Sequence, residues 1–386
     1  MSMKVPSIFF WQNMPTHHQA SSLDELAKLW PAEVTGVWGS RISEARRRLG
    51  WAEPSTTHLK NIFLSNGEKQ WKKEIRKMTA EHHESIHVFS GIGAYAPATF
   101  GFSCLSESKA SRLALIVETP IMLGWQRHLR HWKTRFYYRG HLDEIGCVFA
   151  MGSAGMSYYS KLGFTERQIF PFIYQEEVPA VSFRAAGNVM KLVYAGQINF
   201  RKGLDTLIQA LPLLAGGQWS LTIFGDGPDR ERLERKVHLM GLAAQVFFKG
   251  NTPAGKLIEE LPLYDLCVVP SRFDGWGMVV NEALQSGVPV LASDRTGSSD
   301  LVRSSGAGAV FPVGDFRRIA ELISDRLRSR SILADEKRAA IRFAPRIKPS
   351  VAAEYLRDVL RSVFMGEGDR PSAPWLAEES SLTEGR

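Results

Sequence analysis

Two carboxylates eight positions apart, Asp274 and Glu282, are the residues of this chain whose types and spacing most directly indicate chemistry. The apolar run Leu266–Val269 before them is typical of a buried parallel strand, and Met278–Ser286 is predicted to form a helix. Asp274 then precedes the start of the helix, and Glu282 lies about one turn inside it. Backbone N–H groups at a helix start favour phosphate. The stretch therefore predicts a diphosphate site flanked by carboxylates that accept hydrogen bonds from sugar hydroxyls, which is the pattern of a nucleotide-sugar.

A second loop adds cations to this prediction. The strand predicted at Lys191–Ala195 is followed by a loop between Gly196 and Gly203 that displays Arg201 and Lys202. Arginine binds a diphosphate through its fork of donors, and lysine binds it as a point charge. An exposed basic turn with no ligand is the alternative interpretation.

The length and composition of the chain indicate a two-domain enzyme in a reducing compartment. Its 386 residues exceed the size at which one hydrophobic core stops growing, and 44% hydrophobic residues can fill two cores. The three cysteines, Cys104, Cys147 and Cys267, are scattered without the spacing of metal ligands. The first residues do not read as a signal peptide, and no apolar run is long enough to span a membrane. We therefore expect a cytoplasmic protein.

The formal net charge of +8 is concentrated in the first half of the chain. Residues 1–175 contain 21 Lys and Arg against 14 Asp and Glu, whereas the remainder contains 27 against 26. This asymmetry is typical of contact with an anionic membrane surface, a nucleic acid or an anionic acceptor, and also of a solvated basic face. Two segments that combine basic residues with indoles, 41–77 and 125–139, favour the membrane interpretation. In the second segment an apolar stripe recurs at helical spacing, which also suits a helix side that faces the core. The stripe consists of Trp125, Leu129, Trp132 and Phe136.

The first half alternates short apolar runs with amphipathic ones, which predicts a parallel sheet covered by helices. Its first strand is expected at Ser7–Trp11 and its first helix from about Ser21. Doubly wound sheets bind ligands at the carboxyl ends of their strands, so polar residues at these ends are candidates for binding an acceptor. A polar turn without a ligand, or a structural histidine, is the alternative. The candidates are Asn13, His17, His18, Gln19 and His87.

The loop Gly91–Ala96 imitates a dinucleotide-binding fingerprint, with Glu118 at the place of the acid that would bind a ribose. Pro97 directly after the loop argues against this interpretation, as does the internal position of the unit in the chain. An NAD-dependent oxidoreductase is therefore an alternative to the nucleotide-sugar enzyme. A non-enzymatic binder of anionic lipid or nucleic acid is another, because the first half is basic.

Five segments of the second half resemble, in order and spacing, the family 4 glycosyltransferases, which are retaining enzymes of the GT-B fold. The segments are YAGQINFRKGLDTLIQAL, LTIFGDGPDRERL, VFFKGN, YDLCVVPSRFDGWGMVVNEALQSGVPVLAS and TGSSDLV. The resemblance implies an α/β protein with two Rossmann-like doubly wound domains that face each other across a cleft. We expect an acceptor-side domain at 1–175, a linker at 176–189, a nucleotide-sugar domain at 190–345, a helix at 346–365 that returns to the first domain, and a disordered tail at 366–386.

The resemblance also implies roles for individual residues. Asp274 would bind hydroxyls of the donor sugar, and Glu282 would bind the ribose. Arg201 and Lys202 would stabilise the departing diphosphate, and Glu118 stands near the place of the family's histidine beside the sugar. The implied donor-binding residues are Gly196, Gln197, Gly225, Lys249, Asn251, Gly275, Trp276, Gly277, Met278 and Val279.

The chain departs from the family's pattern at the donor site, where Asp274 replaces a glutamate and Gln197 replaces an arginine. The resemblance implies sugar transfer with retention, from a nucleotide-diphosphate sugar to a glycan or lipid-linked acceptor in cell-surface polysaccharide synthesis. The sequence contains no D-x-D motif, and we expect neither a metal nor another cofactor. The expected partners are the donor, the acceptor and an anionic membrane surface, without nucleic acid. The expected location is the cytoplasm, or the inner face of the plasma membrane as a peripheral protein.

Overall fold

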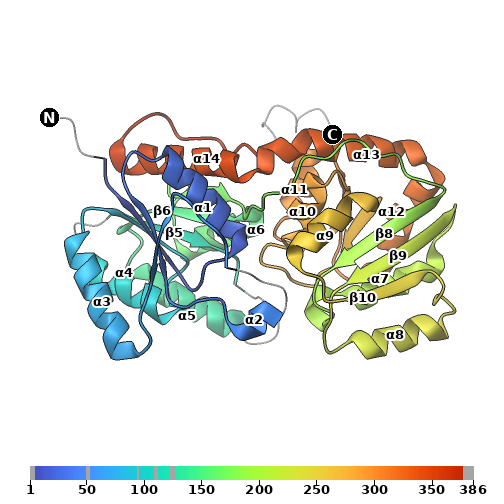
Figure 1. Cartoon of the computed structure of the whole chain (residues 1–386), viewed down its shortest axis with the longest axis horizontal. Coiled ribbons are helices and arrows are strands. Elements are labelled where there is room, and N and C mark those ends of the chain that lie inside the picture. Colours follow the sequence, from blue (N-terminus) through green and yellow to red (C-terminus); the bar gives the residue numbers. More distant parts are fainter. Residues whose placement is uncertain (1–4, 49–52, 94, 108–111, 121–126, 377–386) are drawn as a thin grey trace. The chain divides into compact units, whose positions relative to one another are not determined.

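The computed structural model of the chain describes residues 5–48, 53–93, 95–107, 112–120 and 127–376 and consists of two compact units (Figure 1). Unit 1 is built mainly from the chain up to Glu176 and from Pro349–Ala373. Unit 2 is built mainly from Glu177–Lys348, and the residues that follow Ala373 also belong to it. The chain therefore passes from unit 1 to unit 2 and back before its last described residues.

Unit 1 contains a seven-stranded parallel sheet in the order β3-β2-β1-β4-β5-β6-β7. Every residue of the central strands β1, β2 and β4 is buried, which requires helices on both faces of the sheet. The strands are β1 Ile8–Gln12, β2 Val34–Trp38, β3 Lys60–Phe63, β4 Ile86–Phe89, β5 Arg112–Val117, β6 Ile145–Met151 and β7 Ile169–Phe172. The helices are α1 His17–Leu29, α2 Glu44–Arg48, α3 Glu68–Glu81, α4 Ala96–Ser106, α5 Arg127–Arg139, α6 Gly152–Leu162 and α14 Pro349–Met365, of which α14 packs against α1.

Unit 2 contains a six-stranded parallel sheet in the order β10-β9-β8-β11-β12-β13. Counted within the unit this order is 3-2-1-4-5-6, the doubly wound arrangement whose switch point lies between its first and fourth strands, here β8 and β11. The strands are β8 Val189–Ala195, β9 Gln218–Phe224, β10 Val246–Gly250, β11 Leu266–Val269, β12 Val290–Ser293 and β13 Gly308–Phe311. The α-helices are α7 Leu204–Ala210, α8 Arg230–Leu239, α9 Ala254–Glu260, α10 Val279–Gln285, α11 Ser299–Ser305, α12 Phe316–Arg328 and α13 Arg330–Phe343.

The two parallel sheets confirm the predicted fold class of an α/β protein with two Rossmann-like domains. Among the residues that the structure describes, none of the helices combines the length and the apolar character needed to cross a bilayer.

The first helix of unit 1 begins earlier than predicted. Serines near position 21 suggested its N-terminus, but α1 starts at His17, after Thr16 in an extended conformation. The Ser22 hydroxyl is buried and donates to the carbonyl of Gln19 one turn back, which satisfies it inside the helix. His17 and His18 consequently belong to the first turn of α1 and not to a loop.

The predicted disordered tail is wrong for residues 366–376. The Trp375 side chain is only 1% exposed, and the Arg346 guanidinium donates to the carbonyls of Pro374 and Leu376 at 2.5 and 2.8 Å. The prediction rested on the polar composition of the segment and did not account for Trp375, whose buried indole fixes the chain around it. Residues 377–386 lie outside the described part of the chain.

Candidate functional site

The loops after β8 and β11 meet because these two strands are neighbours at the switch point of unit 2. The two strands are parallel, with Leu266 opposite Leu192, so both end at the same edge of the sheet. A backbone hydrogen bond from the Arg272 N–H to the Arg201 carbonyl, 2.8 Å long, ties the loops together. Residues about seventy positions apart in the sequence thus form one surface.

The charged residues predicted on these two loops lie in direct contact. The Lys202 ammonium is 2.5 Å from one carboxylate oxygen of Asp274, and the Arg201 guanidinium is 3.5 Å from the other. Arg201 also donates to the carbonyl of Phe273 at 3.1 Å, which orients its fork. The structure therefore brings together three of the five residues predicted to be catalytic, with two cations around one carboxylate.

Two glycines permit this close approach of the loops. Gly203 has φ of +68°, and a Cβ there would lie 2.0 Å from the carbonyl oxygen of Pro270. Gly277 has φ of +92°, and a Cβ there would lie 2.8 Å from Thr296 and 3.4 Å from the Asp274 carboxylate. A side chain at either position would push the loops apart.

A third loop, after β12, holds Asp274 in place. The Asp274 N–H donates to the carbonyl of Arg295, and the Asp274 carbonyl accepts from the N–H of Gly297, both at 3.0 Å. The Ser298 hydroxyl donates to the carbonyls of Trp276 and Gly277 at 2.7 and 3.0 Å. Ser298 is fully buried, so it positions the loop through its hydrogen bonds. The sequence showed a polar loop here but gave no sign of which residue braces the site.

Glu282 and Trp276 are both buried at α10. Glu282 is 6% exposed and lies near Cys267 of β11, where burial, with a smaller contribution from the Glu282 carboxylate, raises the pKa of the thiol. The Trp276 indole is 3% exposed and donates to the Asn281 side chain at 2.9 Å. The indole therefore packs against α10 and leaves little surface for a ligand, so a donor contact at Trp276 would involve its backbone.

The remaining donor candidates divide into three groups. Gly196 and Gly225 lie against each other, since a Cβ on Gly225 would be 1.9 Å from the Gly196 carbonyl oxygen. Gln197 is exposed beside them and accepts a hydrogen bond from Asn199. Lys249 lies near the end of β10 and Asn251 directly after it; β10 is an edge strand that β9 separates from β8. Lys249 lines a different hollow, of about 370 Å³, between α8 and β10. In the third group, Gly275 and Met278 belong to the β11–α10 connection, and Val279 is the first residue of α10.

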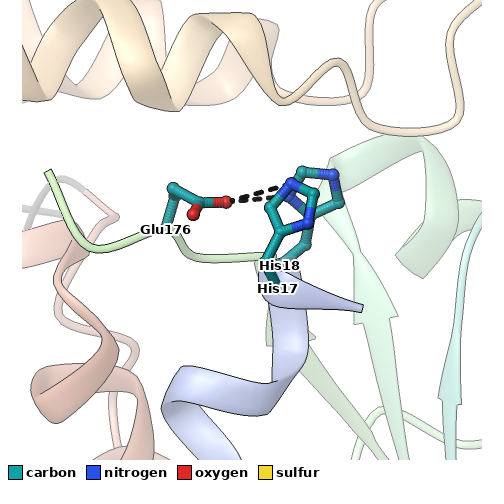
Figure 2. A group of neighbouring side chains, drawn as sticks. All are labelled: His17, His18 and Glu176. Carbon is teal, nitrogen blue, oxygen red and sulfur yellow. Dashed lines mark hydrogen bonds and ion pairs between the residues drawn. The ribbon is translucent and has the colours of Figure 1, made fainter. Parts of the chain in front are cut away.

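Figure 2 shows His17 and His18 at the start of α1, with their rings directed at Glu176. The His18 Nδ1 lies 3.1 Å and the His17 Nε2 3.5 Å from the same oxygen of Glu176. Burial lowers the pKa of each imidazole to about 4; the His18 ring adds to this for His17, and the Arg46 charge adds to it for His18. Burial raises the pKa of Glu176. The imidazoles are therefore neutral at pH 7.

The other acceptor candidates of unit 1 do not join this group. Asn13 is exposed, and its backbone carbonyl accepts from the N–H of Ser40 at 2.9 Å. Gln19 is buried in α1.

His87 is corrected from an acceptor candidate to a core residue. It is the second residue of β4, not its carboxyl end, and is completely buried. Its Nδ1 accepts from the Trp11 indole at 3.1 Å, and its Nε2 lies 2.9 Å from the carbonyl of His82. Burial lowers its pKa to about 4, partly offset by the hydrogen bond to His82. Periodicity predicted the strand but could not show that both ring nitrogens have partners inside it.

Unit 1 contains a cavity of about 580 Å³ that the sequence did not reveal as a whole. It brings the glycine loop and Glu118 together, as the fingerprint required, and adds tyrosines from three other segments. Its lining includes Gly91, Gly93, Glu118, Lys133, Tyr137, Tyr159 and Tyr174. Tyr174 forms a hydrogen bond with Glu118, and burial raises its pKa, with the Glu118 charge adding to this. Tyrosines scattered over nearly forty positions carry no periodic signal, so only the fold collects them.

The glycine loop itself does not favour a dinucleotide. The N–H of Gly93, which a pyrophosphate would use, donates to the Thr99 hydroxyl at 2.9 Å. α4 begins at Ala96 with Pro97 in its first turn. The Gly93 N–H is thus already hydrogen-bonded within the protein. Ala94, in the same loop, lies outside the described residues.

Comparison with known sequences covers the second half of the chain. Residues 181–344 match the family model described as glycosyl transferases group 1. A mannosyltransferase of Mycolicibacterium smegmatis, named as GDP-mannose-dependent and acting on phosphatidylinositol monomannoside, is 34% identical over 149 residues. An alpha-D-kanosaminyltransferase of Streptomyces kanamyceticus is 28% identical over 166 residues. These matches cover 36% and 42% of this chain, and only 37% and 41% of the respective relatives.

Comparison with solved structures covers both units. The Anabaena protein HepE in complex with UDP matches with a TM-score of 0.71 over 92% of this chain and 100% of its own, at 16% identity. The lipopolysaccharide outer core galactosyltransferase WaaB matches with a TM-score of 0.67 over 92% and 99%, at 14% identity. At such identities the likeness establishes the fold alone. Residues 181–344 are therefore similar to the glycosyl transferases group 1 family, and the whole chain has the GT-B fold.

Proposed function

We propose that this chain is a retaining glycosyltransferase that transfers a sugar from a nucleotide-diphosphate sugar to a glycan or lipid-linked acceptor in cell-surface polysaccharide synthesis. The observation that carries the proposal is the contact of Arg201 and Lys202 with Asp274 at the switch point of the family-matched domain. Ligands of doubly wound sheets bind at this place, and the charges there suit a diphosphate joined to a sugar.

The proposed reaction follows from these charges. An acceptor hydroxyl attacks the anomeric carbon from the side on which the bond to the diphosphate breaks, and its proton passes to the departing phosphate oxygen. Negative charge develops on that oxygen, where Arg201 and Lys202 would stabilise it. Asp274 would then release the cations and accept hydrogen bonds from the sugar. Two protein cations supply the charge that a metal would otherwise supply, so we propose transfer without a metal.

The cavity of unit 1 suits an acceptor glycan. Sugar rings pack on aromatic faces while their hydroxyls bind carboxylates, and this cavity offers Tyr137, Tyr159 and Tyr174 beside Glu118. Lys133 at the same cavity would favour an acceptor that carries negative charge. We therefore place acceptor binding in this cavity, with Glu118 as the residue that touches the acceptor or the transferred sugar.

The donor can be identified by its effect on thermal stability. A ligand that binds only the folded protein raises the melting temperature, and the rise grows with the logarithm of the ratio of ligand concentration to Kd. The mycobacterial relative is named for GDP-mannose, and HepE was solved with UDP, so the panel compares UDP-, GDP- and ADP-sugars with free sugars, NADH and DNA. We expect a rise of several degrees for one class of nucleotide-sugar and none for NADH or DNA. A shift for NADH or DNA without one for any nucleotide-sugar would refute the proposed function.

An exposed aromatic pair on α5 supports contact with an anionic membrane. Trp132 and Phe136 are 63% and 74% exposed and stack with ring centroids 6.0 Å apart, in a helix that also exposes Lys133, Arg135 and Arg139. The predicted stripe therefore faces outward at these positions; Trp125 lies outside the described residues. Exposed aromatics among cations suit the interface of an anionic bilayer.

Replacing Trp132 and Phe136 together with alanine is expected to reduce binding to anionic vesicles by about ten-fold, because two interfacial rings and their apolar area are lost. Binding is measured by co-sedimentation with vesicles that contain or lack anionic lipid. Phe247→Ala, which removes a 45% exposed ring from unit 2, is the matched control and should leave binding unchanged. Equal binding of the double variant and the native chain would rule out this surface.

A further inference from the structure

The start of α1 and the end of unit 1 bring together two imidazoles and a carboxylate that no step of the proposed sugar transfer uses. The ligand atoms of His17, His18 and Glu176 all lie within 4.8 Å of one another. Within the described part of the chain, no other group of three histidine, cysteine or acidic side chains is arranged in this way. We propose that His17, His18 and Glu176 bind a divalent transition-metal ion of the zinc class.

The distances suit the coordination sphere of such an ion. Zinc binds histidine nitrogen and carboxylate oxygen at about 2.0–2.2 Å, which places the ligand atoms of a tetrahedral site about 3.3 Å apart. The distances from the Glu176 oxygen to His18 Nδ1 and His17 Nε2, 3.1 and 3.5 Å, lie on either side of this value. The two rings are 3.9 Å apart between centroids and tilted by 59°, so both nitrogens can face one point from adjacent residues (Figure 2).

The ligands are positioned by the backbone as well as by their own contacts. The N–H of Gln175 donates to the carbonyl of His18 at 3.1 Å, and Gln175 is buried. This bond places Glu176 beside the first turn of α1 independently of its carboxylate.

The ligand types indicate the kind of ion and its effect. Two imidazoles with one carboxylate suit zinc and its neighbours among the transition metals, whereas magnesium and calcium prefer oxygen ligands alone. Three protein ligands leave the fourth position to water or to an anionic ligand. His18 and Glu176 are 158 positions apart in the sequence. The ion would therefore join α1 to Glu176, where the chain leaves unit 1 for unit 2. It would therefore stabilise the folded unit 1.

Metal binding is tested on the full chain without a histidine tag, after treatment with a chelator and dialysis. Titration with Co²⁺ is expected to give a visible ligand-field absorption that saturates at one ion per chain and that Zn²⁺ abolishes. Zn²⁺ is also expected to raise the melting temperature, whereas Mg²⁺ and Ca²⁺ at the same concentration are not.

Glu176→Gln and His18→Ala are each expected to weaken Zn²⁺ binding about ten-fold or more, since each removes one of three ligands. The amide in Glu176→Gln has the shape of the carboxylate, and a cooperative melting curve shows that the variant is folded. The control is His141→Ala, because His141 Nδ1 is 3.1 Å from Glu144, the same separation, in a pair without a third ligand. It should bind Zn²⁺ like the native chain.

If the native chain and the folded Glu176→Gln variant have the same affinity for Zn²⁺, whether both bind it or neither does, the proposal is overturned. The three residues would then form only a hydrogen-bonded junction. The result is independent of the proposed function, because the nucleotide-sugar panel reports on unit 2. If a nucleotide-sugar still raises the melting temperature of Glu176→Gln, the proposed function stands independently of the metal site.

Discussion

Replacing Lys202 with alanine is expected to lower the rate of sugar transfer by about 10²–10³-fold, the typical loss when one group that stabilises developing negative charge is removed. Lys202 contacts Asp274 directly in the structure, so its removal also leaves that carboxylate with Arg201 alone, 3.5 Å away. Without Lys202 the two loops lose the net positive charge that attracts the diphosphate of the donor. We therefore expect the donor KM to rise as well as kcat to fall.

Asp274→Ala is expected to cause a comparable loss of transfer, but with a different kinetic pattern. It removes the proposed hydrogen-bond acceptor for the sugar and leaves both cations for the diphosphate, so kcat should fall more than the donor KM rises. Rates are measured as transfer of labelled sugar from the nucleotide-sugar that the thermal panel selects. Because the two side chains touch, the losses in the double variant should not add.

The matched control for these variants is Lys256→Ala, which removes an exposed lysine from α9 of the same unit. It should retain native activity. Melting curves establish that Lys202→Ala and Asp274→Ala remain folded, as expected for partly exposed residues on loops. Native activity in both site variants would contradict the proposed function.

Asp265→Ala is expected to destabilise unit 2 by about 3–5 kcal/mol, the loss found when one partner of a buried ion pair is removed. Asp265 and Lys337 are 1% and 3% exposed at their side chains, and the ammonium lies 2.6 Å from the carboxylate. Asp265 also accepts from the N–H of Lys191 at 2.9 Å. Its removal would leave a buried ammonium and an unsatisfied backbone donor. The free energy of unfolding is measured by urea denaturation with a probe that reports on unit 2.

The destabilisation should depend on pH in a direction that follows from Lys337. Burial lowers the pKa of this lysine from its ordinary 10.5, and Asp265 opposes that effect. Without Asp265 the folded protein holds the proton less tightly than the unfolded chain does, so the unfolded chain binds more protons. Stability must then rise with pH, and part of the loss should be recovered between pH 7 and the ordinary pKa of lysine.

Arg318→Ala provides the control for the buried pair, because Arg318 and Glu321 form an ion pair on the exposed side of α12. Its effect should remain below about 1 kcal/mol. A loss for Asp265→Ala no larger than that for Arg318→Ala would show that the buried pair contributes no more than a surface one.

The proximity of the charged loops at the proposed donor site could be predicted from the sequence because its signals are local. A short apolar run, a glycine-bearing loop and a helix recur along unit 2, and Arg201, Lys202 and Asp274 each follow a strand. Parallel strands place their carboxyl ends at one edge, so residues that follow neighbouring strands meet. The bracing hydroxyl of Ser298 could not be predicted, because a serine in a polar loop looks the same whether or not it is buried.

The candidate acceptor residues of unit 1 were placed less well because their signals are not local. His87 lies in a strand that periodicity located, yet its burial between Trp11 and His82 depends on which strands lie beside β4. The cavity around Glu118 draws tyrosines from separate segments, and no spacing rule connects them.

The sequence by itself determined the two α/β units, the order of their elements and the charged loops of the proposed donor site, since each of these is encoded within a few neighbouring residues. Only the tertiary structure decided which distant side chains lie together: Lys337 with Asp265, the tyrosines with Glu118, and His17 and His18 with Glu176. The physical reason is that such contacts depend on strand order and on the burial that packing imposes. Neither leaves a periodic trace in the chain.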